Sequence, residues 1–225
     1  MGSIVRCIDH LVVPTNDVAR DTAALAGVLG LDAGPPTTLH VWFTSAMFFL
    51  GNVWLEVGHF RDYDGPLGHV QSIAFEPSPT AAARDELARR GIAHNDSKRA
   101  DGPMGWTTTG LPELLDGRVG VFLCEYHFDR TPDEREAIRA RFGRVAEGID
   151  DRRRWARDEL RARTGGALGI DSVFEVTIAT PDLSGEHARW PWQSALPWPR
   201  RWPQPWAPPS RPVRSPCPRP AQGRV

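Results

Sequence analysis

The sequence lacks several features that would place it in a broad class at once. Its 225 residues contain no apolar run long enough to cross a bilayer, and the first residues, MGSIVRCIDH, show no signal-peptide pattern. Only three cysteines occur, far apart, which argues against a disulfide framework and against a cysteine-rich zinc site. Phosphate-binding glycine loops and a Ser-His-Asp order are missing too. These absences favour a cytoplasmic protein with no membrane partner.

The distribution of charged residues argues against a nucleic-acid-binding protein. The formal net charge is -1, and Lys98 is the single lysine among 27 basic residues. Acidic and basic residues alternate in the most charged segment, 130–168, so no basic patch is predicted. Hydrophobic residues make up 40% of the chain, which is enough for a buried core in one large or two small domains.

A repeated order of elements organises the first half of the chain. The patterns predict a strand at 8–14 and a helix at 17–29, with Asn16 as the helix cap and Gly30 as its end. Three further strands are predicted at 38–45, 46–51 and 53–57. The order begins again after residue 67, with Ser78-Pro79 as the helix start and Gly91 as its end, at 70–76, 80–90, 104–111 and 118–126. We predict an α+β fold: paired βαβββ modules, about 4–60 and 67–128, that form a curved mixed sheet around a cleft.

Three segments follow this domain of residues 1–129. Residues 130–168 predict a charged helical linker with a solvated face, beginning at a capping box of Thr131 and Glu134. Residues 169–190 resemble the start of a third, incomplete module. Residues 191–225 are so rich in proline, arginine and tryptophan that we predict no stable fold. A slipped reading frame is one hypothesis for this tail, which translation of the other two frames past codon 190 would test.

Four polar side chains occupy matching places in the two modules. The closing strands VWLEVGHF and FLCEYHF carry Glu56 and Glu125, and the opening strands carry His10 and Gln71. Each of the last two lies twenty positions before the glycine that ends its helix. An imidazole, an amide and two carboxylates suit a divalent metal such as Zn, Ni, Fe or Mn, with coordination positions left for substrate.

One of these positions has an alternative. His69 lies two residues before Gln71 and faces the same way on an extended strand, so it is also a candidate for the site. Two histidines and a carboxylate would form the facial triad of non-haem iron oxygenases. With His69, the aromatic residues Trp42 and Trp54 are predicted to contact substrate as part of a pocket wall.

The repeat spacing, with IDHLVV at the start and WLEV and FLCEY on the closing strands, resembles the vicinal oxygen chelate superfamily, in particular its glyoxalase-like and bleomycin-resistance-like members. The resemblance covers residues 4–128 and part of 170–190. It implies that His10, Glu56, Gln71 and Glu125 ligate the metal and that Glu125 also acts as the general base.

The activity implied by the resemblance is that of a metal-dependent isomerase or lyase, which acts on a small oxygenated substrate through an enolate. The same superfamily contains extradiol dioxygenases and metal-free drug-binding proteins, and its modules often pair between chains, so a homodimer is an expected partner state. An adaptor role for the charged linker and the tail rests on composition alone.

Overall fold

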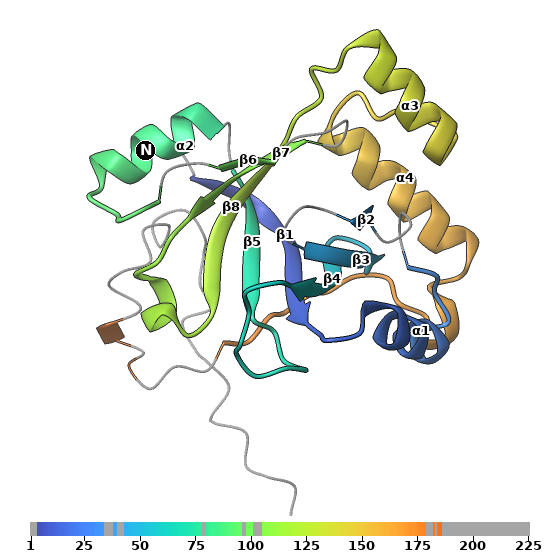
Figure 1. The fold of residues 1–225 in the computed structure, drawn as a ribbon, viewed down its shortest axis with the longest axis horizontal. Helices are drawn as coiled ribbons and strands as arrows, with labels where there is room; N and C mark the ends of the chain where they lie inside the picture. Colours follow the sequence, from blue (N-terminus) through green and yellow to red (C-terminus); the bar gives the residue numbers. More distant parts are fainter. Residues whose placement is uncertain are drawn as a thin grey trace, which may run out of the picture. The chain divides into compact units, whose positions relative to one another are not determined.

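Two strand-helix-strand patterns meet side by side at the centre of one mixed sheet (Figure 1). The computed structural model describes residues 4–33, 38–39, 43–77, 80–95, 98–100, 105–178, 182 and 184–185. The sheet has the order β2-β3-β4-β1-β5-β8-β7-β6. Its strands are β1 (Val5–Pro14), β2 (Thr38–Leu39), β3 (Phe43–Phe49), β4 (Trp54–Phe60), β5 (Ser72–Pro77), β6 (Lys98–Ala100), β7 (Trp106–Gly110) and β8 (Gly120–Tyr126).

The strand directions show the two modules directly. β1 runs parallel to β4, β5 runs parallel to β8, and the opening strands β1 and β5 pair antiparallel at the junction. The predicted α+β fold with paired βαβββ modules is therefore confirmed. One detail was wrong: β3 is a single strand from Phe43 to Phe49, where two strands were expected to meet at residues 45 and 46. All its residues pair in register with β4, so no turn interrupts it.

The sheet has an outer and an inner face because side chains alternate along each strand. On the outer face, helix α2 (Thr80–Arg89) buries Ala83 and Leu87 against a cluster that includes Ile73 and Leu123. On β5 the other set of residues, Ser72, Ala74 and Glu76, points to the inner face. Every residue of β5 is buried, as expected for a central strand.

Helix α1 (Val18–Leu29) packs on β3 and β4, and its ends largely follow the sequence signals. Its cap is Asp17, whose side chain accepts a hydrogen bond from the backbone N–H of Arg20, rather than Asn16. Gly30 ends the helix as predicted, at a φ of 63°. A side chain here would be strained, and its Cβ would lie 2.4 Å from the backbone nitrogen of Ala167 in the turn η2 (Gly166–Leu168).

Helix α3 (Pro132–Phe142) begins at the predicted capping box. Thr131 accepts from the backbone N–H of Glu134, and the Glu134 carboxylate accepts from the backbone N–H of Thr131. We expect Thr131→Ala to lower the stability of this helix by about 1 kcal/mol, because the backbone N–H of Glu134 loses its acceptor. Hydrogen exchange of the amides of α3 measures this, with Thr164→Ala, outside the helix, as the control. Equal protection of α3 in both variants would contradict it.

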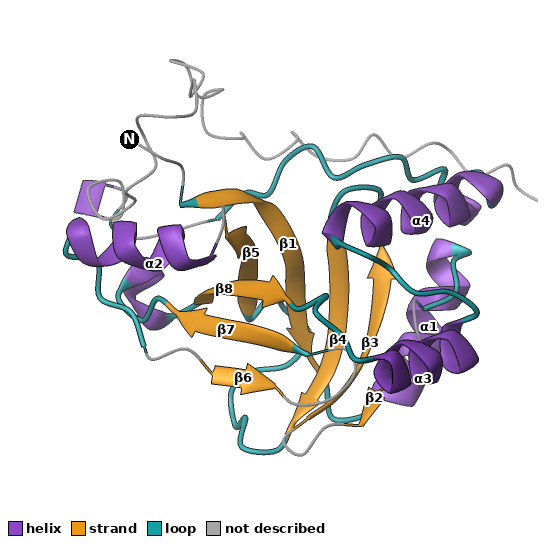
Figure 2. Ribbon diagram, turned by 90° about the horizontal axis from the view of Figure 1, so that it is seen from above, coloured by secondary structure: helices purple, strands orange, loops and turns teal. Residues whose placement is uncertain are grey.

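Helix α4 (Ile149–Ala162) covers the inner face near β3 and β4 (Figure 2). Its buried residues are Arg153, Ala156 and Leu160, spaced along one stripe of the helix. The expectation of a solvated charged face for this segment is therefore wrong for the side that meets the sheet. The charges alternate in sequence, but the helix gathers two adjacent arginines on the buried side.

The remaining described segments carry little regular structure. The turn η1 (Leu114–Gly117) leads into β8, and residues 171–178 contain no helix or strand. The third module therefore stays a prediction, and the tail 191–225, like Ser78-Pro79, lies outside the described residues. None of the described helices is long and apolar enough to span a membrane.

Candidate functional site

A bulge in β1 brings two neighbouring polar side chains to the same face of the sheet. Ile8 pairs with Phe75 and His10 pairs with Ala74, so Asp9 is the extra residue. Strict alternation would turn Asp9 and His10 to opposite faces. With the bulge, both point inward, and they are 0% and 4% exposed.

Three side chains form a line across this inner face. The Asp9 Oδ2 atom lies 2.6 Å from His10 Nδ1, and His10 Nε2 lies 3.4 Å from Glu56 Oε2. His10 Nδ1 therefore donates, because the Asp9 pKa is held at about 2 and a carboxylate only accepts. The Nε2 atom faces the Glu56 oxygen, so a proton or a cation between them would join the two side chains.

Several groups hold Asp9 ionised in spite of its burial. Burial raises the pKa of Asp9. The hydrogen bond and charge of His10, followed by the charges of Arg152 and Arg153, lower this pKa by a larger amount. Tyr126 donates its hydroxyl to Asp9 Oδ2 at 2.9 Å. Arg153 Nη2 donates to Asp9 Oδ1 at 3.1 Å. Both oxygens of Asp9 therefore accept hydrogen bonds, Oδ2 from two donors and Oδ1 from one.

Arg153 ties helix α4 to both modules. The same Nη2 atom lies 3.0 Å from Glu76 Oε2 of β5, and Nη1 donates to the backbone oxygen of Asn52 at 3.1 Å. Arg6 pairs with the other oxygen of Glu76 at 2.9 Å. This buried network joins β1, β5, the turn before β4 and α4 in one set of charge-assisted contacts.

Arg152 directly precedes Arg153 on helix α4, and its guanidinium lies over two aromatic rings. Its guanidinium carbon lies 4.6 Å from the ring centre of Trp54 and 4.2 Å from that of Tyr126. Burial lowers the Arg152 pKa, but the neighbouring Tyr126 and Asp9 outweigh this and raise it, so the side chain is a cation. Burial in the same layer raises the pKa of Tyr126 well above its ordinary value, so its hydroxyl keeps its proton and donates to Asp9.

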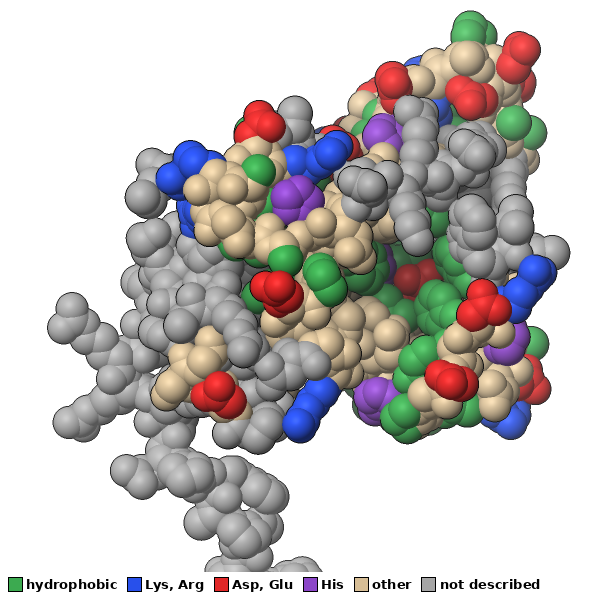
Figure 3. Space-filling view, turned by 60° about the vertical axis from the view of Figure 1, so that its left-hand side comes forward, with side chains coloured by type: hydrophobic (Ala, Val, Ile, Leu, Met, Phe, Trp, Pro, Cys, Tyr) green, Lys and Arg blue, Asp and Glu red, His purple; other side chains and the backbone are tan. Residues whose placement is uncertain are grey.

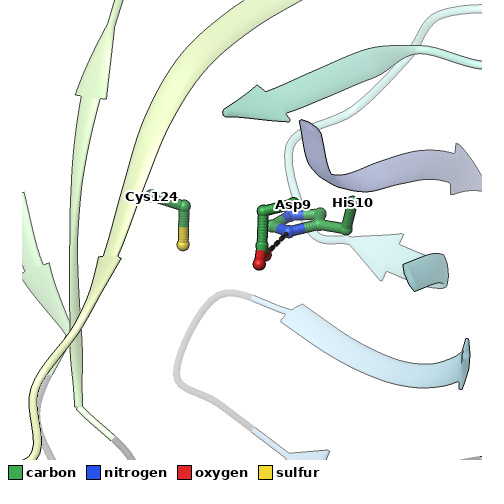
Figure 4. Close-up of side chains that lie close together, drawn as sticks. All are labelled: Asp9, His10 and Cys124. Carbon is green, nitrogen blue, oxygen red and sulfur yellow. Dashed lines mark hydrogen bonds and ion pairs between the residues drawn. The ribbon is translucent and has the colours of Figure 1, made fainter. Parts of the chain in front are cut away.

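Asp9, His10 and Cys124 lie close enough together to hold a metal ion, with one donor atom of each within 4.8 Å of the others (Figure 4). This trio fits a metal poorly. Both Asp9 oxygens already accept hydrogen bonds, and burial raises the pKa of the Cys124 thiol well above its ordinary value, which disfavours the thiolate that metals bind.

The pair of His10 Nε2 and Glu56 Oε2 fits an ion better. Two donors bound at about 2.1 Å in a tetrahedral arrangement lie about 3.4 Å apart, and the observed separation is 3.4 Å. The hydrogen bond from His10 Nδ1 to a carboxylate is the arrangement that commonly orients a metal-binding histidine. Asp9 would then be the orienting residue for a metal held by the other two.

The structure separates the four predicted metal ligands. His10 and Glu56 come together, but β8 turns Phe122, Cys124 and Tyr126 inward, so Glu125 points to the outer face and pairs with Thr107. Cys124 was expected to point away from the site and Glu125 toward it, and the observed alternation along β8 is the reverse.

The other predicted contacts are spread out. Gln71 precedes β5 and accepts a hydrogen bond from Ser72 Oγ at 2.5 Å, while His69 is exposed in the preceding loop. Trp54 is 4% exposed on the inner face beside Arg152. Trp42 lies outside the described residues. The catalytic, metal and substrate roles of these residues stay predictions.

Strand pairing relates the inner-face residues of the two modules. His10 lies opposite Ala74 across the junction of β1 and β5. His10 also pairs with Trp54, and Ala74 pairs with Phe122, so Glu56 and Cys124 each lie two residues beyond these partners. On the inner face the second module thus carries an alanine and a thiol, whereas the first carries an imidazole and a carboxylate.

A hollow opens on the face shown in Figure 3, with an acidic side chain at its floor among hydrophobic ones. Sequence reasoning missed Asp9, Arg152, Arg153 and Tyr126. The one available signal was the adjacent pair Asp9-His10, since two polar residues in a row within an apolar strand both face the core only if the strand bulges.

Comparisons with known proteins give a likeness of fold. No family model and no curated protein matches the chain. Among solved structures, methylmalonyl-CoA epimerase from Mycobacterium tuberculosis is 16% identical, with a TM-score of 0.48 over 56% of this chain and 91% of that chain.

Two further solved structures are similar at the same level. A variant of the Streptomyces coelicolor methylmalonyl-CoA epimerase in complex with 2-nitronate-propionyl-CoA is 21% identical, with a TM-score of 0.45 over 58% of this chain and 100% of that chain. A hypothetical protein from Bacillus halodurans is 17% identical, with a TM-score of 0.42 over 55% and 96%. Likenesses at this level assign no activity to the chain.

Proposed function

We propose that the chain is a divalent-metal-dependent isomerase or lyase of the vicinal oxygen chelate type, acting on a small oxygenated organic substrate. The observation that carries the proposal is the line from Asp9 through His10 to Glu56, in which His10 Nε2 and a carboxylate oxygen face each other at 3.4 Å. His10 and Glu56 would hold the ion, and Asp9 would fix the imidazole. A bound divalent ion supplies Lewis-acid polarisation of a substrate oxygen.

The proton acceptor in such a reaction is best assigned to Glu56. An isomerase needs a base near the carbon that loses its proton. Asp9 accepts from three donors and is held ionised by them, so it is a weak base. Glu125, the base implied by the resemblance, lies on the outer face. Glu56 is 9% exposed, and its second carboxylate oxygen makes no hydrogen bond or ion pair with the described residues.

Metal analysis tests the proposal without requiring a substrate. We expect about one equivalent of Zn, Ni, Mn or Fe to remain after dialysis of the wild-type protein and to be lost in His10→Ala and in Glu56→Gln. Asp9→Asn is expected to weaken binding about 10- to 100-fold, the usual effect of removing an orienting partner. Glu125→Gln is the matched control and should bind metal as the wild type does.

Two results of the metal analysis would contradict these assignments. Metal kept in Glu56→Gln would contradict the assignment of Glu56, and metal lost in both Glu56→Gln and Glu125→Gln would favour the set implied by the resemblance. A wild-type protein that takes up no metal would contradict the enzyme as proposed.

A second candidate is a metal-free small-molecule binding protein. The observation that favours it is the inner face of the second module, where Ala74 lies opposite His10 and Cys124 lies two residues beyond the β8 partner of Ala74. In this case a proton on His10 Nε2, rather than a metal, lies between the imidazole and Glu56. Proton resonances of His10 that are unchanged by added Zn or Ni would support this candidate.

A further inference from the structure

A cavity of about 320 Å³ lies between α4, the end of β8 and the inner face of β3 and β4. Five aromatic residues contribute to its walls: Phe49, Trp54, Tyr126, Phe128 and Trp155. The volume is at the lower end of the range for small-molecule sites. Flat rings on several sides favour an apolar body of one or two rings.

Cations outnumber acids in the wall of this cavity. Four arginines line it against two carboxylates, which are Arg130, Arg144, Arg152, Arg163, Asp32 and Glu159. The two carboxylates are both taken, since Arg163 pairs with Asp32 and Arg144 pairs with Glu159. Arg130 donates to the backbone oxygen of Ala146 at 2.9 Å. The wall therefore carries an excess of positive charge, which attracts an anion.

Arg152 is the cation that most needs an acceptor. Among the described residues, no carboxylate lies within ion-pair distance of Arg152, whose partners are two ring faces, the Tyr126 side chain and the sulfur of Met47 at 3.9 Å, with the charge of Asp9 nearby. In the described part of the chain, the Nη1 atom of Arg152 is buried without a hydrogen-bond partner, and so is Nε1 of Trp54. Both donors belong to residues of the cavity wall. A buried donor without an acceptor is unfavourable, so an acceptor brought by a ligand would be stabilised here.

We propose that this cavity binds a small aromatic carboxylate, with its ring among the aromatic walls and its carboxylate on the guanidinium of Arg152. A carboxylate is the anion that matches a guanidinium in shape and charge. This binding site goes beyond the proposed isomerase, because it uses neither His10 nor Glu56 and needs no metal.

Equilibrium dialysis of the full chain with 2-naphthoate and with its neutral isostere, 2-naphthamide, tests the proposal. We expect the acid to bind the wild type at least about tenfold more tightly than the amide, the factor for one charge-assisted hydrogen bond. Arg152→Met should remove this preference. Arg154→Met is the matched control, since Arg154 is exposed on the same helix, and it should keep the preference.

The proposal fails if the wild type binds acid and amide equally or binds neither. It also fails if a folded Arg152→Met protein, checked by circular dichroism, keeps the preference for the acid. If that variant does not fold, the comparison of acid and amide on the wild type decides. His10→Ala should retain naphthoate binding, so failure of the metal proposal and failure of this one are separate results.

Discussion

Replacing Arg153 by methionine is expected to lower the free energy of unfolding by about 3–5 kcal/mol, the usual cost of removing one partner from a buried ion pair. Arg153 is 7% exposed, and its guanidinium is shared by Asp9 and Glu76, which are 0% and 7% exposed. Methionine fills similar volume without charge, so the loss reports on two carboxylates left without their cation. Urea unfolding at pH 7 measures it.

Arg154→Met is the matched control for this prediction as well. The next side chain on α4 is 58% exposed and pairs with Asp151 at the surface, where an ion pair contributes about 0–1 kcal/mol. In a double-mutant cycle, Asp9→Asn and Arg153→Met should couple by more than about 1 kcal/mol because they share one contact. Additive effects of the two substitutions, or equal losses in Arg153→Met and Arg154→Met, would show that the network does not hold α4 on the sheet.

Local signals in the sequence were sufficient for the modules. Gly30, the capping box at Thr131 and the strand patterns each act within a few residues, so periodicity and turn chemistry reveal them. His10 and Glu56 could be selected because each is a polar residue in an apolar strand, and the structure brings them together.

The sequence could not predict which side chains of β8 point to the inner face. Phe122, Leu123 and Cys124 are all apolar, so neither face of the strand is marked as the polar one, and Glu125 was selected only by its match to Glu56 in the repeat. The register of β8 with β5 and β7 determines which residues point inward, and that register depends on long-range pairing.

The arginines of α4 were hidden for a different reason. Arg152, Arg153 and Arg154 follow one another in sequence, and composition cannot tell which of three identical side chains points to the sheet. The helix places the first two against the inner face and the third in solvent. Their role depends on where α4 docks, which is a tertiary property that helix periodicity does not determine.

Acid is expected to lower the stability of the wild-type protein in a narrow pH window, because Asp9 becomes protonated there. In an unfolded chain an aspartate titrates near pH 3.9, whereas the Asp9 pKa in the folded protein is lowered to about 2. Burial alone would raise this pKa, and His10, Arg152 and Arg153 reverse the effect. The ionised carboxylate therefore contributes stability that is fully present above about pH 4 and is lost as the pH falls through 2, with a size of about 2 kcal/mol.

The comparison with Asp9→Asn isolates this contribution from those of other acids. Asparagine does not titrate, so the variant should be less stable than the wild type at pH 6 and the difference should shrink by about 2 kcal/mol by pH 2. Because every other carboxylate is present in both proteins, their effects cancel in the difference. Urea unfolding at pH 6, 4, 3 and 2 follows it. A constant difference across this range would mean that Asp9 titrates alike in the folded and unfolded chains, and that the contacts with His10, Tyr126 and Arg153 do not favour its charge.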